Sequence, residues 1–170
     1  MIEQLSGQIA TLEVWLKKKA EENSSAQLLQ TQMGVGYLTA LVTVHTLGDI
    51  GRFKRANKAV VSFAGLDPRE MSSAGRVRFG SITKAGSSML RHHLGQAVMT
   101  ATRFDPKLKT FYKRLAKKKP KAVAKTAAAR KLLVKLAIML RDNITAQEFD
   151  QRGRTVGNAR RIAGSEMTAA

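Results

Sequence analysis

The stretch that decides the fold is PKAVAKTAAARKLLVKLAIMLRDN, residues 120–143. It is rich in alanine, and its leading proline suits the first turn of a helix. Its large apolar residues recur at helical spacing on one side. They are Leu132, Leu133, Leu136, Met139 and Leu140. The stretch therefore predicts a long helix that ends near Asn143 with one buried face, and a fold that is mainly α.

Two further helices are expected immediately before this stretch. Ser87 or Ser88 is a suitable N-cap for a helix that runs to about Arg103. Asp105-Pro106 has the N-cap and N1 residues of a second helix, which continues to Lys118. Together the three predicted helices form a basic helical bundle.

The first part of the chain also has a helical pattern. Apolar residues alternate at spacings of three and four over residues 2–22, at Ile2, Leu5, Ile9, Leu12 and Leu16. This stripe could pack on its own domain or pair with another chain as a coiled coil. Beyond a break and N-cap at 23–25, we expect a short helix over 26–32, a buried helix over 37–47 and a basic amphipathic helix over 53–64.

Charge is the strongest feature of the composition. The 30 Lys and Arg against 12 Asp and Glu give a net charge of +18. Between residues 71 and 141 there are 18 basic residues and one acid, Asp105. A solvated surface explains a block of one sign poorly, so a polyanionic partner is favoured. A membrane surface is not, because the basic helices lack Trp- and Phe-rich apolar faces.

The chain contains no cysteine, which excludes disulfides and cysteine-ligated metals. No apolar run is long enough to span a membrane, and the N-terminus does not resemble a secretion signal. These features favour a reducing compartment, the cytoplasm. His92 and His93 are adjacent, so they diverge by about 100° on a helix and cannot easily share a metal. No metal site is expected in this chain.

Two segments are candidate phosphate contacts. In the turn over 33–36, Gly34 and Gly36 let backbone amides approach a phosphate, and the next helix adds its N-terminal dipole. This is the pattern of a helix–hairpin–helix, although such turns also join helices that bind nothing. The basic helix that follows adds Arg52, Lys54 and Arg55.

The loop over residues 71–86 combines hydroxyls, glycines and cations. A serine can attack a phosphodiester only where cations meet the charge that develops on the phosphate oxygens. Arg76, Arg78, Lys84 and Arg91 are the candidates for this role. The alternative is a flexible phosphate-binding loop whose serines only form hydrogen bonds. Residues 76–79 could form a short strand or ribbon.

Further along the chain, basic residues of the predicted bundle are expected to hold nucleic acid. They are Lys107, Lys109, Lys113, Arg114, Lys117, Lys118, Lys121 and Lys125. From Thr145 the periodicity is lost, which predicts a mobile or partner-docked tail.

Several of these motifs together resemble the C-terminal transposase domain of the insertion sequence 110/116/902 family. They are Gly34-Val35-Gly36, Gly65-Leu66-Asp67-Pro68, Ser72-Ser73, Arg78, Gly80, Ile82-Thr83-Lys84, Gly86 and Leu90-Arg91. The resemblance implies a serine that attacks DNA and forms a phosphoserine link during strand exchange. Ser73 aligns best with that serine. Ser72 is the alternative, because Ala74 stands where the family usually has glycine.

The resemblance also implies partners and a division of the chain. Residues 1–24 correspond to a linking coiled-coil segment, 25–150 to the transposase domain and 151–170 to a flexible tail. Full members carry an RNase H-like front domain, which is not expected within these 170 residues, and any divalent metal is expected in that domain. A structured guide RNA and a homo-oligomer are implied as well. Two hypotheses result: a serine-bearing transposase domain that acts on DNA, inactive in isolation, or a non-catalytic helix–hairpin–helix module that binds DNA or RNA.

Overall fold

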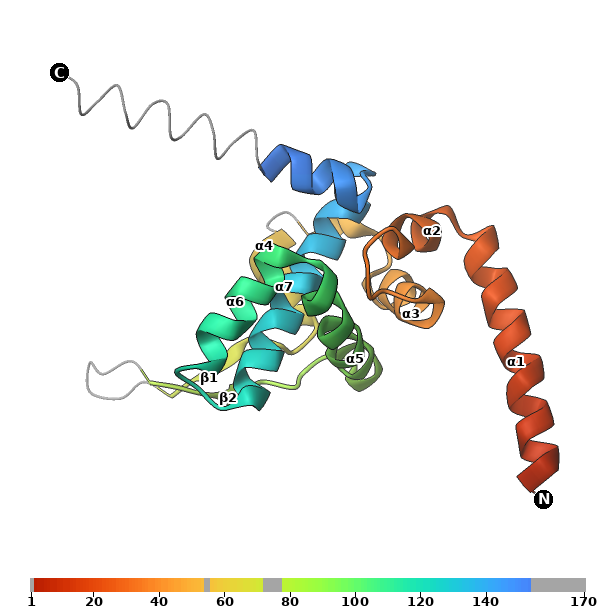
Figure 1. Cartoon of the computed structure of the whole chain (residues 1–170), viewed down its shortest axis with the longest axis horizontal. Helices are drawn as coiled ribbons and strands as arrows, with labels where there is room; N and C mark the ends of the chain where they lie inside the picture. Colours follow the sequence, from red (N-terminus) through yellow and green to blue (C-terminus); the bar gives the residue numbers. More distant parts are fainter. Residues whose placement is uncertain (1, 54–55, 72–77, 154–170) are drawn as a thin grey trace.

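A computed structural model describes residues 2–53, 56–71 and 78–153 of the chain (Figure 1). As predicted, the architecture is mainly helical. The helices are α1 (Ile2–Glu22), α2 (Ser24–Gln30), α3 (Tyr37–Leu47), α4 (Ala56–Phe63), α5 (Ser88–Phe104), α6 (Pro106–Ala116) and α7 (Lys121–Asp142). A 3₁₀ turn, η1 (Ile50–Arg52), connects α3 to α4. The short strands β1 (Pro68–Glu70) and β2 (Phe79–Ile82) lie between α4 and α5.

Side-chain caps fix where the helices begin. The carboxamide oxygen of Asn23 accepts a hydrogen bond from the Ala26 amide at 2.9 Å, which starts α2. Ser87, rather than Ser88, caps α5 through the Leu90 amide. Asp105 caps α6 through the Leu108 amide at 3.0 Å. The predicted starts of these helices are confirmed to within two residues, because each depends on a local hydrogen bond that the sequence specifies.

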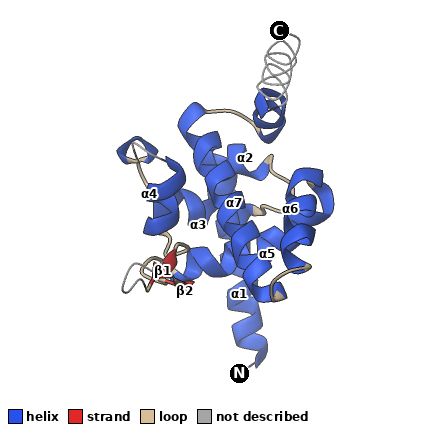
Figure 2. Ribbon diagram, turned by 90° about the vertical axis from the view of Figure 1, so that its left-hand side faces the viewer, coloured by secondary structure: helices blue, strands red, loops and turns tan. Residues whose placement is uncertain are grey.

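Helix α7 lies at the centre of the molecule, with α4, α5 and α6 around it (Figures 1 and 2). Four of its five predicted core residues are fully buried, namely Leu132, Leu133, Leu136 and Met139, and Leu140 is partly buried. Burial of each such side chain stabilises the folded state by about 1.5–3 kcal/mol relative to leaving it exposed. The alanine-rich first half lets neighbouring helices approach closely, because Ala124, Ala128 and Ala129 are buried there.

Helix α1 extends to one side of the body (Figure 1). It confirms the predicted helix, but only Ala20 in it is buried. Most of its apolar stripe is exposed, with Ile2 at 82% and Leu12 at 58%. Leu16 packs against the core at the helix's C-terminal end. Within the described residues, only the C-terminal end of this apolar stripe is packed against the rest of the protein.

Strands β1 and β2 form an antiparallel ribbon. Pro68 pairs with Ile82 and Glu70 with Phe79, and β2 has one extra residue between these pairs, a β-bulge. The Met71 amide donates to the Arg78 carbonyl at 2.7 Å, so the pairing reaches Arg78. The strand predicted over 76–79 is observed at Phe79–Ile82, and residues 76 and 77 lie outside the described residues. Its pairing partner, Pro68–Glu70, was not identified from the sequence pattern.

The prediction of a mobile tail from Thr145 is wrong for its first part. Residues 146–153 are helical, and Ile144 and Ala146 are buried. The Lys135 ammonium holds this segment through both carboxylate oxygens of Asp150, at 3.1 Å each, and also lies 3.6 Å from Asp105. A single buried lysine thus ties three segments together. Residues 154–170 lie outside the described residues.

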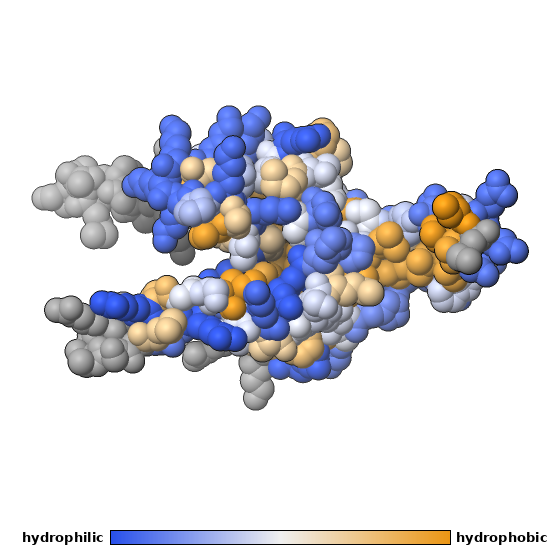
Figure 3. All heavy atoms as spheres, turned by 90° about the horizontal axis from the view of Figure 1, so that it is seen from below, coloured by the Kyte–Doolittle hydropathy of each residue, from blue (hydrophilic) through white to orange (hydrophobic). Residues whose placement is uncertain are grey.

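Figure 3 views the molecule from below and shows a largely hydrophilic face with a hollow between two lobes. Apolar residues gather at its right-hand end, where α1 lies. Within the described residues, no helix is both long and apolar enough to cross a membrane.

Candidate nucleic-acid interface

Two glycines allow the chain to cross itself at the base of the ribbon. Gly65 has a φ of +65°, and a Cβ there would lie 2.5 Å from the Ala85 amide nitrogen. A Cβ on Gly86 would overlap the carbonyl oxygen of Phe63. Both sites therefore exclude any larger residue. This backbone-to-backbone contact sets the direction in which the ribbon leaves the helices.

Hydrogen bonds lock this crossing. The Thr83 hydroxyl donates to the Asp67 carboxylate at 2.7 Å, and the Lys84 amide donates to the Gly65 carbonyl at 3.0 Å. Arg91 donates from one guanidinium nitrogen to the carbonyls of Ala64 and Gly86, at 3.1 and 2.6 Å. Arg91, predicted as a phosphate contact, therefore also acts as a structural clamp.

A hollow of about 350 Å³ lies beside the crossing, and we call it the cationic hollow. Lys84 from the turn after β2, Arg91 from α5 and Lys125 from α7 line it. His92, Ser88 and Thr126 are also in its wall. Three of the predicted phosphate-binding cations, from segments up to 41 residues apart, thus meet at one site.

Contacts with neighbouring backbone segments place two of these cations. Lys84 has a φ of +58°, a left-handed conformation; its amide donates to the Gly65 carbonyl, and the preceding Thr83 hydroxyl donates to Asp67. The Lys125 side chain lies over Gly95 of α5. A Cβ built on Gly95 would be 3.7 Å from the Cε of Lys125, which is ordinary van der Waals contact. The fold therefore brings the segments that carry these cations together, and the Lys84 side chain itself is exposed.

A second, more apolar hollow of about 380 Å³ lies between the ribbon and α7, and we call it the ribbon hollow. Arg130 lines it, together with Ser81 and Thr126. The sequence pattern did not indicate Arg130, because this side chain lines a hollow only where the ribbon lies against α7. His92, which the sequence disfavours as a metal ligand and for which it favours a structural or phosphate-contacting role, also lines the cationic hollow.

The remaining predicted cations of the bundle are spread over α6 and the start of α7. All are exposed, namely Lys107, Lys109, Lys113, Arg114, Lys117, Lys118 and Lys121. The Arg114 guanidinium lies 5.7 Å from the centre of the Phe111 ring. Lys131 of α7, which was not among the predicted cations, lies 4.6 Å from the same ring, so both cations contact an aromatic side chain between α6 and α7. Lys107 lines a separate hollow beside Asp105 and Asp150.

The turn between α2 and α3 was predicted to be an open phosphate contact, but its first glycine is packed against α5. Gly34 has a φ of +91°, and a Cβ there would lie 2.6 Å from the Ala101 nitrogen of α5. Gly36 is exposed with open space around it, and it caps α3 without a side-chain bond. The structure thus explains Gly34 by helix packing, and a phosphate contact at Gly34 or Gly36 stays a prediction.

Other predicted residues fall in two groups. Arg52 donates to the Leu47 carbonyl at 2.8 Å, and its guanidinium lies 4.6 Å from the centres of both the Phe53 and Phe63 rings. Arg78 is exposed at the start of the ribbon. The predicted residues Ser72, Ser73, Arg76, Lys54 and Arg55 lie outside the described residues.

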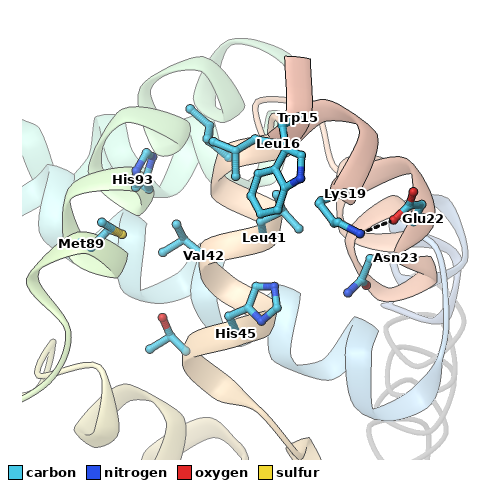
Figure 4. Close-up of a pocket in the computed structure, with 12 residues that line it drawn as sticks. Trp15, Leu16, Lys19, Glu22, Asn23, Leu41, Val42, His45, Met89 and His93 are labelled. Carbon is cyan, nitrogen blue, oxygen red and sulfur yellow. Dashed lines mark hydrogen bonds and ion pairs between the residues drawn. The ribbon is translucent and has the colours of Figure 1, made fainter. Parts of the chain in front are cut away.

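A third hollow, of about 810 Å³, is an apolar groove between α1, α3 and α5 (Figure 4). Trp15 and Leu16 from α1, Leu41 and Val42 from α3 and Met89 from α5 line it. His93 lies in the same groove, and burial, followed by the neighbouring His92, lowers the pKa of His93. No predicted nucleic-acid contact lies here. Over the described ranges, no three His, Asp or Glu side chains are grouped to hold a metal.

These features agree with a family of DNA-mobilising proteins. Residues 26–113, about half of the chain, match the Transposase IS116/IS110/IS902 family. The chain belongs to this family. The matched region contains the α2–α3 turn, the crossing and the ribbon.

Individual relatives are named as transposases or as proteins of insertion elements. The transposase for insertion sequence element IS1111A of Coxiella burnetii is 41% identical over 83 residues, which are 49% of this chain and 22% of that protein. The putative transposase y4pF/y4sB of Sinorhizobium fredii is 34% identical over 138 residues, 76% of this chain and 34% of that protein. An IS110 protein of Streptomyces coelicolor is 30% identical over 132 residues, 77% and 32% of the two chains. The chain thus spans between about a fifth and a third of these relatives.

Proposed function

We propose that this chain is the part of a DNA transposase that grips DNA at the base of the ribbon and supplies a serine for strand exchange. One observation carries the proposal: Lys84, Arg91 and Lys125 line a single hollow beside the ribbon. Ser72 and Ser73 directly follow Met71 in the sequence and lie outside the described residues, so the approach of their hydroxyls to this phosphate is part of the proposal.

The proposed chemistry is a transesterification. The hydroxyl of Ser73, or alternatively Ser72, attacks the phosphorus and loses its proton. A phosphorus–serine ester forms, one phosphorus–sugar ester breaks, and the sugar oxygen leaves as a protonated hydroxyl. The number of phosphoester bonds is unchanged, so the reverse attack by another strand end can complete the exchange without an energy source. Cations near the phosphate are needed because negative charge develops on its oxygens.

The remaining parts of the reaction are proposed to come from outside this chain. We infer an RNase H-like domain with a divalent metal, a structured guide RNA and a homo-oligomer as partners of this segment. The share of the relatives that the chain spans leaves room for such a front domain in them. We expect the chain alone to bind nucleic acid without transposing it.

The test uses a chimera in which this chain replaces the matching segment of the Coxiella burnetii relative. It is incubated with a nicked suicide DNA, from which a covalent protein–DNA adduct cannot revert. An adduct that Ser73→Ala abolishes, and Ser72→Ala does not, supports Ser73 as the nucleophile. Adduct formation unchanged in both variants would reject the serine assignment.

The same experiment separates the second candidate function, a non-catalytic helix–hairpin–helix module. Gly36 favours it, because this exposed N-cap of α3 makes no side-chain cap bond and leaves backbone amides open to a phosphate. DNA binding without any adduct in the wild-type chimera would select this module over the transposase domain.

A further inference from the structure

The ribbon hollow has the composition of a site for a flat, mainly apolar ligand. Its walls are the ribbon on one side and α7 on the other. The apolar side chains in them are Leu66, Pro68, Ile82, Ala122, Val123 and Ala127. A few polar groups lie among them, namely Ser81, Thr126 and Arg130. Apolar walls with a few polar groups are typical of sites that bind small rings.

The ribbon hollow adjoins the cationic hollow. Leu66, Ile82 and Thr126 line both, so these three residues form the partition between them. One side of this partition is cationic and the other is apolar. A nucleotide has the same division, with a charged phosphate at one end and an uncharged aromatic base at the other.

We propose that the ribbon hollow takes one unstacked nucleobase of the strand whose phosphate lies in the cationic hollow. The proposal rests on the proposed function only in that the chain must bind nucleic acid there. The base would lie between Ile82 of the ribbon and Val123 and Ala127 of α7. Arg130, Ser81 and Thr126 supply hydrogen-bonding groups for its edge.

Two features favour a base over other occupants of this hollow. The surrounding segment, residues 71–141, carries a net charge of +17, which selects for a polyanion and against a basic peptide. Arg130 is the only cation among the described residues that line the ribbon hollow, whereas Lys84, Arg91 and Lys125 line the cationic hollow. The backbone would therefore follow the cationic side, and the base the apolar side.

Access to the ribbon hollow is open. Val123 is 48% exposed, and Ala122 and Ser81 are also exposed. The Thr126 hydroxyl donates to the Ala122 carbonyl at 3.0 Å within α7, so its oxygen remains available to accept a hydrogen bond. A base could enter from solvent without a change in the helical core.

The experiment measures binding of short single-stranded DNA oligonucleotides to the whole chain by fluorescence anisotropy. In a series of oligonucleotides, one position at a time lacks its base but keeps its sugar and phosphate. We expect loss of the base at one position to weaken binding about five- to tenfold, the effect of losing one stacked base. RNA of the same sequence forms a second arm.

Ala127→Leu fills the ribbon hollow without removing a cation. It is expected to weaken binding of the intact oligonucleotide by a similar factor and to abolish the sensitivity to the missing base. Ala10→Leu, on the exposed face of α1, is the matched control and should retain that sensitivity. Val123→Ser is a second variant, and because Val123 is half exposed it should fold normally even if Ala127→Leu does not.

The outcomes separate the two levels of the account. Salt-sensitive binding that is indifferent to every missing base, or a full effect of the missing base in both hollow variants, would overturn the nucleobase site alone. Sensitivity confined to RNA would overturn the assignment to a DNA strand. No salt-sensitive binding of any oligonucleotide would overturn the proposed function and the nucleobase site together.

Discussion

The base of the ribbon and the α2–α3 turn are both glycine-containing segments predicted to contact phosphate, yet the fold uses them differently. At the ribbon, Gly65 and Gly86 let two backbone segments cross, and the crossing positions Lys84 and Arg91 beside Lys125. At the turn, Gly34 lets the backbone pack against α5, and the cation in the neighbouring hollow, Lys135, is already paired with Asp105 and Asp150. A glycine pattern marks a close approach, and only the charges around it indicate whether a phosphate is involved.

The largest effect that would test this comparison is Gly86→Ala. Because its Cβ would overlap the carbonyl oxygen of Phe63, we expect a loss of about 3 kcal/mol in the free energy of unfolding, or failure to fold. Chemical denaturation measures it. Gly7→Ala on exposed α1 is the control and should stabilise the chain by about 0.5–1 kcal/mol. A Gly86→Ala protein as stable as wild type would contradict the crossing.

Arg91→Lys should have the next largest effect. Lysine keeps the charge, but its side chain is shorter and does not place a donor where the guanidinium nitrogen of Arg91 bonds to the Ala64 and Gly86 carbonyls. We expect a loss of about 1–3 kcal/mol in stability, measured by thermal or urea unfolding. Arg103→Lys, exposed on α5, should change stability little. An unchanged melting temperature, together with lost DNA binding, would instead assign Arg91 to phosphate alone.

Gly36→Ala tests the other half of the comparison and should have a smaller effect. A Cβ at this position meets nothing within 4 Å, so the fold should tolerate it. If the α2–α3 turn is secondary to the cationic hollow, DNA affinity should fall less than it does on replacing Lys84 and Lys125. A larger fall in affinity, with stability unchanged, would make the turn the main phosphate contact.

The smallest effect concerns pH. Burial lowers the pKa of His93 in the folded chain, so the unfolded chain binds the proton more readily. Stability should therefore decline slightly as the pH falls from the ordinary histidine range toward the lowered pKa, and it should be insensitive to this group above that range. Thermal melts at neutral and mildly acidic pH check it, with His93→Gln removing the decline and His92→Gln retaining it.

Local interactions explain what the sequence predicts well. Asn23, Ser87 and Asp105 cap their helices through amides three residues away, so the helix starts can be predicted from the sequence alone. The leucines of α7 were identified for the same reason, since one helical period defines their face. The resemblance of the motifs to a transposase family is confirmed by the match over residues 26–113.

Long-range contacts explain what could not be predicted. Arg91 bonds to a carbonyl 27 residues away, and Gly34 packs on Ala101, so neither structural role is visible in a local pattern. Lys135 captures Asp150 and orders a segment that has no apolar periodicity of its own. Arg130 matters only because the ribbon lies against α7, an arrangement that depends on the crossing.

The most direct test of the central claim, that nucleic acid is held at the base of the ribbon, is the salt dependence of duplex DNA binding. Combining Lys84→Gln with Lys125→Gln should reduce the log–log slope of affinity against salt by about two, since each lost phosphate contact accounts for about one. The control pair Lys18→Gln and Lys19→Gln, on exposed α1, should leave the slope unchanged. An equal slope in wild type and the ribbon-base variant would contradict the account.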